Sequence, residues 1–176
     1  KLQTIKIQLF ELISKFPNDP YINAALGEIY YKEDIFERAQ KYFENSIQIF
    51  NEYPKPAISL INILSTLDLF EKAENILINI VEKHQNNIEV LHTAAKLYSK
   101  FYRPQKAVIY YKKLLEFIDN DILILISAAE QALLANDNKF AIKLSEQILT
   151  LDNTNINGWQ LLSRAYTQAG DHISAY

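Results

Sequence analysis

Hydrophobic residues recur along most of this chain at steps of three and four positions, with polar residues between them. That period places the apolar side chains on one face of an α-helix. Only three glycines and five prolines interrupt the chain, too few for a fold rich in strands and turns. The pattern predicts a first series of helices over 21–33, 55–67, 89–101, 123–135 and 157–169, and a second series over 36–50, 70–84, 104–118 and 138–151. The two series alternate along the chain, which predicts antiparallel helix pairs.

Alanine recurs at a fixed distance of 34 residues, at Ala39, Ala73, Ala107, Ala141 and Ala175. Other positions keep the same step, and they form the columns Leu26, Leu60, Ala94, Ala128 and Leu162; Gly27, Ile61, Ala95, Ala129 and Ser163; and Tyr30, Leu64, Tyr98, Ala132 and Tyr166. Small side chains allow two helices to approach closely, and bulky ones fill the space between neighbouring pairs. We interpret the pattern as a 34-residue unit without insertions. One such pair cannot bury its apolar face alone, so successive units stack.

These 34-residue units resemble the tetratricopeptide repeat (TPR) family. "LGEIYYKEDIFERAQKYF" (26–43) follows its consensus of Leu-Gly, Tyr, Ala and Phe. "WQLLSRAYTQAGDHISAY" (159–176) matches it through Trp159, in the place of the leading aromatic residue, and through Leu162, Tyr166, Gly170 and Ala175. "LDNTN" (151–155) is similar to its usual break between repeats. The second, third and fourth units lack the consensus Gly and leading Trp but keep the register. The resemblance implies an all-α fold, an α-solenoid with a right-handed superhelix of antiparallel helix pairs. A Sel1-like or HEAT-like array is the alternative, although those repeats have other periods.

The register divides the chain into one continuous TPR segment. We expect the second helix of a preceding repeat at 1–17, four repeats at 20–53, 54–87, 88–121 and 122–155, and the first helix of a fifth repeat at 156–176. We expect such a segment to be a fragment of a longer array. We therefore expect exposed apolar ends and end-to-end self-association at high concentration.

Charge and composition exclude several classes of partner. The net charge of −3 and the pI of about 5.7 argue against nucleic acid, and no run of apolar residues is long enough to insert into a bilayer. The chain has no cysteine and hence no disulfide or thiolate metal site. The compartment is not assigned by the sequence; the cytoplasm is the default, and a bacterial periplasm is compatible.

No residue pattern indicates chemistry. His84, His92 and His172 have no ligand partner at suitable spacing, and His84 falls at a helix end where a cation suits the helix dipole. No glycine-rich phosphate loop is present. We predict no catalytic residue, no metal and no cofactor, so that the chain is not an enzyme.

In the family, the first helices of successive repeats line a concave face where partner peptides lie. On this sequence the recurring positions of that face are Tyr21, Glu28, Tyr31, Lys55, Ile58, Asn62, Glu89, His92, Lys96, Leu123, Ile126, Glu130, Asn157, Gln160 and Arg164, with Ala24, Ser65, Ser99, Leu133 and Thr167 in the same register. The mixture fits an extended or helical ligand with one apolar anchor and charges of both signs. The alternative is that these residues are merely exposed to solvent.

Two specific uses of that face are disfavoured. The carboxylate clamp for chaperone tails needs Lys and Asn on one first helix, Asn on the next, and Lys and Arg on the third. Lys55 and Asn62 are suggestive of it, but the third and fourth units bring no matching Asn or Lys-Arg pair. The asparagine ladder of O-GlcNAc transferase is absent, since its column here reads Ala25, Ser59, Thr93, Ser127 and Leu161.

The sequence therefore predicts a non-catalytic scaffold or adaptor for protein–protein interaction, with a protein or peptide partner. Two rival functions stay open. One is a substrate-recruiting arm of a larger enzyme or of an envelope or secretion complex. The other is a self-assembling structural module.

Overall fold

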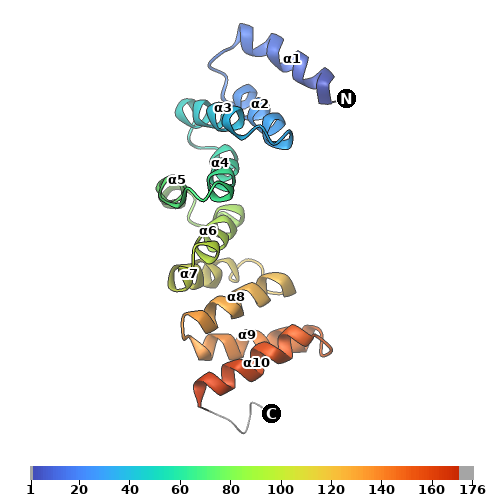
Figure 1. Cartoon of the computed structure of the whole chain (residues 1–176), viewed down its shortest axis with the longest axis vertical. Coiled ribbons are helices and arrows are strands. Elements are labelled where there is room, and N and C mark those ends of the chain that lie inside the picture. The colour runs from blue at the N-terminus through green and yellow to red at the C-terminus, as the bar shows by residue number, and fades with distance from the viewer. Residues whose placement is uncertain (1, 171–176) are drawn as a thin grey trace. The chain divides into compact units, whose positions relative to one another are not determined.

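The computed structural model describes residues 2–170, which form ten α-helices and no strand (Figure 1). The predicted all-α class of paired helices is thereby confirmed. Two residues used in the sequence analysis, His172 and Ala175, lie outside the described residues.

The chain divides into two compact units, Lys1–Thr93 and Ala94–Tyr176. The first unit contains α1 (Leu2–Lys15), α2 (Pro20–Lys32), α3 (Phe36–Ile49), α4 (Pro54–Thr66), α5 (Phe70–Lys83) and the beginning of α6 (Ile88–Lys100). From α1 to α5 each helix packs against the next, and α2 also contacts α4. Helices of the first series therefore touch each other as well as their own partners.

The second unit contains the remainder of α6 together with α7 (Pro104–Leu114), α8 (Ile122–Leu134), α9 (Asn138–Leu151) and α10 (Ile156–Ala169). Here α7 packs on α8, α8 on α9 and α9 on α10, and α8 also contacts α10. The pattern of contacts is the same as in the first unit.

Helix positions follow the repeat. First-series helices begin at residues 20, 54, 88, 122 and 156, and α1 begins 34 residues before α3. The predicted first-series starts were each one residue late. The predicted helix over 104–118 was wrong at its end, because α7 stops at Leu114. Beyond it the N–H groups of Glu116 and Phe117 bond three residues back, to Lys113 and Leu114, so the chain tightens into a turn.

Side chains of Asp and Asn, and proline rings, start several helices. The Asp19 carboxylate accepts hydrogen bonds from the N–H groups of Tyr21 and Ile22, both at 2.9 Å, and Asp121 caps α8 in the same way. Pro20 and Pro54 occupy the first helical position, where a missing N–H costs little.

Each first-series helix is followed by one residue in the left-handed region. These residues also recur every 34 positions, and they are Asp34, Asp68, Tyr102, Asn136 and Gly170. The next N–H then bonds back to the last turn of the helix, as from Arg103 to the Tyr98 carbonyl at 2.9 Å. At this position only Gly avoids the steric cost of a left-handed backbone.

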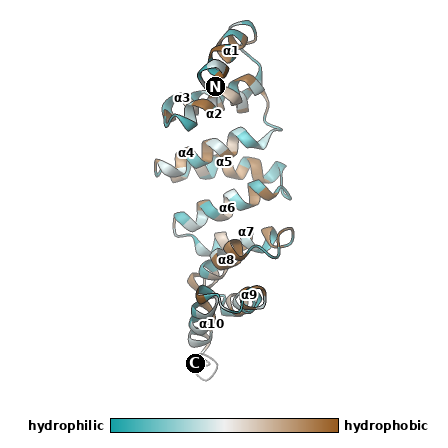
Figure 2. Cartoon of the chain, turned by 90° about the vertical axis from the view of Figure 1, so that its right-hand side faces the viewer, coloured by the Kyte–Doolittle hydropathy of each residue, from teal (hydrophilic) through white to brown (hydrophobic). Residues whose placement is uncertain are grey.

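The columns found in the sequence form the core. Ala39, Ala73, Ala107 and Ala141 are completely buried. Hydrophobic and hydrophilic segments alternate along the helices, as Figure 2 shows. The first helix, α1, also carries exposed apolar side chains, among them Ile5, Ile7 and Phe10.

Candidate functional site

The predicted binding residues lie on the surface. In the first unit they belong to α2, α4 and the start of α6, and we call this surface of the first unit the first-helix face. Tyr21, Lys55 and Glu89 are exposed, and the rest are half-buried, namely Glu28, Tyr31, Ile58, Asn62 and His92. None of these eight side chains is buried in the core.

A small pocket of about 170 Å³ opens between α2 and α4 on this face. It brings together three of the predicted residues, Tyr21, Glu28 and Lys55, with Tyr53 and Pro56 completing the wall. An aromatic ring, a carboxylate and an ammonium group thus line one depression, which matches the mixed chemistry expected for this face.

Tyr21 is the centre of an aromatic cluster. Its ring centroid lies 5.8 Å from that of Tyr53 and 6.2 Å from that of Phe50, with tilted planes. Tilted rings at this separation attract each other through their quadrupoles. Tyr53 and Phe50 were missed in the sequence: Tyr53 lies in the break "NEYPKP" (51–56), and Phe50 ends the predicted second-series helix 36–50, so neither belongs to the first-series register.

Glu28 is held in place from the neighbouring first-series helix. The Ser59 hydroxyl of α4 donates a 2.6 Å hydrogen bond to Oε1 of Glu28 on α2. This bond leaves the second carboxylate oxygen for another donor. The column containing Ser59 thus orients a predicted binding residue.

In the second unit the predicted residues lie on the rest of α6, on α8 and on α10. Leu123 is 76% exposed, an unusual position for an aliphatic side chain, and Ile126 beside it is half-buried. The remaining predicted residues of this unit are all exposed, namely Lys96, Glu130, Asn157, Gln160 and Arg164.

Two residues in the register of the predicted binding positions are buried, Ala24 in the first unit and Leu133 in the second. Leu133 is 1% exposed and belongs to the core, because α8 is apolar on most of its circumference and buries this position. Two exposed apolar residues of α10 were missed, Ile156 and Trp159. Trp159 takes the place of side chains that are buried in the other repeats, such as Leu125, and it donates a hydrogen bond from Nε1 to the Asn153 carbonyl.

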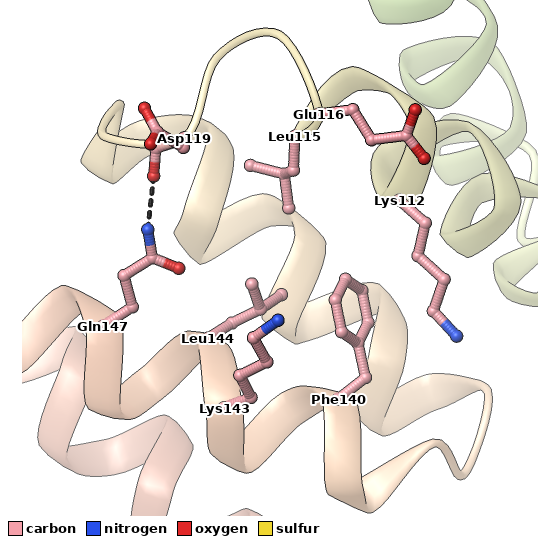
Figure 3. A pocket seen from close by; sticks show the side chains of 8 residues that line it. All are labelled: Lys112, Leu115, Glu116, Asp119, Phe140, Lys143, Leu144 and Gln147. Atoms are coloured by element: carbon pink, nitrogen blue, oxygen red, sulfur yellow. Dashed lines mark hydrogen bonds between the residues drawn. The ribbon is translucent and has the colours of Figure 1, made fainter.

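A cleft of about 520 Å³ opens between the second-series helices α7 and α9 (Figure 3). Lys112 on its rim pairs with Asp137 at 2.7 Å, and its Nζ lies 4.8 Å from the ring centroid of Phe140. Across the cleft Gln147 donates a hydrogen bond to the Asp119 carbonyl, the contact drawn as a dashed line. Cations and acids are both present, because Lys143 and Glu116 line the same cleft.

Lys112 also changes the titration of its partner. Its hydrogen bond is the main cause that holds the pKa of Asp137 below the usual range for a carboxyl, and the N–H of Phe140 contributes. Partial burial acts in the opposite direction. Asp137 is therefore an anion at neutral pH and caps the start of α9.

The α7–α9 cleft has counterparts in the first unit. A cleft of about 340 Å³ lies between α3 and α5, and one of about 540 Å³ between α1 and α3. The same repeat positions line all three, and they are Ile13, Ile47 and Leu115; Tyr42, Ile76 and Leu144; and Asn45, Asn79 and Gln147. The repeat thus generates two kinds of surface, the first-helix face and a series of second-helix clefts.

The described residues offer little for covalent chemistry. Within 2–170 no three His, Asp or Glu side chains gather as metal ligands would. His84 ends α5 as its C-cap residue, and His92 lies half-buried on α6. No helix in the described part of the chain combines the length and apolar character that a bilayer crossing demands.

Comparison with known proteins identifies the fold. No family model and no curated protein matches the sequence. Among solved structures, YrrB, a TPR protein with an unusual peptide-binding site, superposes with a TM-score of 0.84 at 11% identity, covering 95% of this chain and 86% of YrrB. PilF of Pseudomonas aeruginosa gives 0.75 at 15% identity over 99% of this chain and 79% of its own. MamA of Desulfovibrio magneticus RS-1 gives 0.74 at 13% identity over 89% and 88%. The resemblance to TPR proteins is therefore confirmed at the level of the fold.

Proposed function

We propose that this chain is a protein–protein interaction scaffold that docks a segment of a partner protein on its first-helix face, without catalysis. The observation that carries the proposal is the α2–α4 pocket, where Tyr21, Glu28 and Lys55 meet around an aromatic cluster. A peptide there would contact a ring, a carboxylate and an ammonium group at once, which gives orientation as well as affinity.

Two further observations support a peptide as the ligand. Leu123 and Ile126 supply an aliphatic anchor on α8, and exposed aliphatic groups of this kind mark interaction surfaces. YrrB, whose fold this chain shares, carries a peptide-binding site. Tetratricopeptide repeats typically act as non-catalytic interaction modules, in keeping with the chemistry of this face.

The test is a comparative affinity capture from a lysate of the source organism, read by mass spectrometry. The baits are the natural chain, a variant of the first-helix face (Tyr21→Ala with Lys55→Glu) and a variant of an exposed second-series position (Lys72→Glu). We expect partners that are retained by Lys72→Glu and lost from the first-helix variant. Equal helicity of the three baits, measured by circular dichroism, ensures that the loss reflects binding. Identical partner sets for all three baits would refute the proposal.

A further inference from the structure

The α1–α3 cleft differs from the other second-helix clefts in its charge. Its nine lining residues include two cations, Arg38 and Lys41, and no acid. In the α3–α5 cleft, Lys83 is accompanied by Glu82. The α7–α9 cleft also mixes both signs. A chain with a net charge of −3 thus carries one cleft whose charge is purely positive.

Two stacked tyrosines form the floor of this cleft. The rings of Tyr30 and Tyr42 are nearly parallel, with an interplanar angle of 9° and centroids 5.6 Å apart. Lys6 lies over the Tyr30 ring with its Nζ 4.3 Å from the centroid, but its charge is paired with the Glu33 carboxylate and adds nothing to the cleft. Nη1 of Arg38 donates to the Tyr30 hydroxyl at 3.3 Å. Burial, followed by the neighbouring Tyr30, raises the pKa of Tyr42, so this phenol is neutral and offsets none of the positive charge.

Part of this arrangement serves the fold. The same stack recurs in the second unit, where Tyr98 and Tyr110 lie 5.6 Å apart at 13° and Lys106 approaches the Tyr98 ring. A tyrosine pair with a cation over one ring is therefore a device of the repeat. Arg38 has this structural role, because its guanidinium group contacts Tyr30. Only the N–H groups that do not bond to Tyr30 can bind a ligand.

Lys41, in contrast, has no structural role in the packing of the helices. It is exposed and takes part in no ion pair among residues 2–170. Around it the cleft offers the ring of Phe10, which is 39% exposed, the half-buried Ile13 and the amide of Asn45. An amide can bond to both the N–H and the C=O of a peptide backbone.

We propose that the α1–α3 cleft is a second docking site, separate from the first-helix face, for an acidic extended peptide of a partner protein. The charge of the cleft selects the ligand: carboxylates approach Lys41 and the free donors of Arg38, while an alternating apolar side chain packs on Phe10 and Ile13. An extended strand suits this division, because its successive side chains point to opposite sides.

The test is fluorescence anisotropy with a labelled octapeptide in which glutamate and leucine alternate, added to the whole 176-residue chain. Lys41→Glu replaces an attraction with a repulsion, and we expect it to raise the Kd about tenfold. The matched control is Lys143→Glu, which changes the same repeat position in the α7–α9 cleft. Lys72→Glu, at an exposed position of α5 that lines none of the described clefts, is the second control.

We expect both controls to keep the Kd within about twofold of the natural chain, and we expect a lysine–leucine octapeptide not to bind. The inference is overturned if the acidic peptide does not bind, if Lys143→Glu or Lys72→Glu weakens binding as much as Lys41→Glu, or if the basic peptide binds equally well. Lys41 has no partner in the fold, so the variant tests recognition without disturbing the helix packing.

Discussion

The ring of Phe43 lies so close to Gly27 that a β-carbon on Gly27 would stand 2.6 Å from Cε1 of that ring. Phe43 is completely buried and cannot move aside. Gly27→Ala should therefore destabilise the chain by about 1–3 kcal/mol through overpacking, even though Ala is the better helix former by about 1 kcal/mol. Urea unfolding followed by circular dichroism measures the change.

The control for this prediction replaces the other residue of the contact. Leu77 occupies the position of Phe43 in the next repeat, opposite the larger Ile61. Adding Phe43→Leu to Gly27→Ala should restore part of the lost stability, because the smaller side chain makes room for the methyl group. If Gly27→Ala alone were as stable as the natural chain, the close contact would not be a real constraint.

Tyr102 should be replaceable with a gain in stability. Its φ of 54° is costly for a tyrosine, and its side chain is 84% exposed and contributes little packing. Tyr102→Gly should stabilise the chain by about 0.5–1 kcal/mol, the steric relief less the added entropy of the unfolded glycine. Tyr102→Ala keeps the β-carbon and should give no gain. A midpoint of urea unfolding that rises equally for both variants would disprove the explanation by backbone strain.

Asp121 should behave as a helix cap. Its carboxylate accepts the N–H groups of Leu123 at 2.9 Å and Ile124 at 3.1 Å at the start of α8. Asp121→Ala should cost about 1 kcal/mol of unfolding free energy, whereas Asp121→Asn, which retains an acceptor, should cost little. Thermal unfolding of the two variants separates these cases, and an equal loss in both would assign the effect to charge rather than capping.

The ion pair of Asp137 with Lys112 predicts a dependence of stability on pH. The pKa of Asp137 is lower in the folded chain than in the unfolded one, so its contribution is present above the unfolded pKa and is lost as the pH falls through the folded pKa. The natural chain should therefore be more stable than Asp137→Asn at neutral pH, and the difference should shrink below about pH 4. Urea midpoints at both pH values measure it. A difference that does not change with pH would exclude the charge as its cause.

Much of the fold could be predicted because the buried residues recur periodically in the sequence. The buried alanines Ala39 to Ala141 recur at a step that fixes both helices of each pair. The end of α7 could not be predicted, because the apolar pattern continues through Phe117 while the backbone has already turned. Local backbone hydrogen bonds determine where α7 ends, and the periodicity of the side chains does not reveal them.

The candidate site was predictable only where it follows the repeat. Tyr21, Glu28 and Lys55 were found through their register, but Tyr53 lies in an irregular segment that periodicity does not describe. The second-helix clefts were missed for a different reason: they arise between helices of different repeats, and their charge depends on which residues happen to face each other. In the sequence alone, nothing distinguishes Arg38 and Lys41 from other cations on exposed helix surfaces.

Trp159 provides an intrinsic fluorescence signal that reports on one end of the chain only. It is the single tryptophan of the sequence, and it lies half-exposed on α10 in the second unit. Its emission therefore follows the melting of that end alone, whereas circular dichroism sums every helix. In an array stabilised by nearest neighbours, the two signals coincide only if the whole chain unfolds in one step. A gap between the two curves would measure how weakly the first unit is coupled to the second.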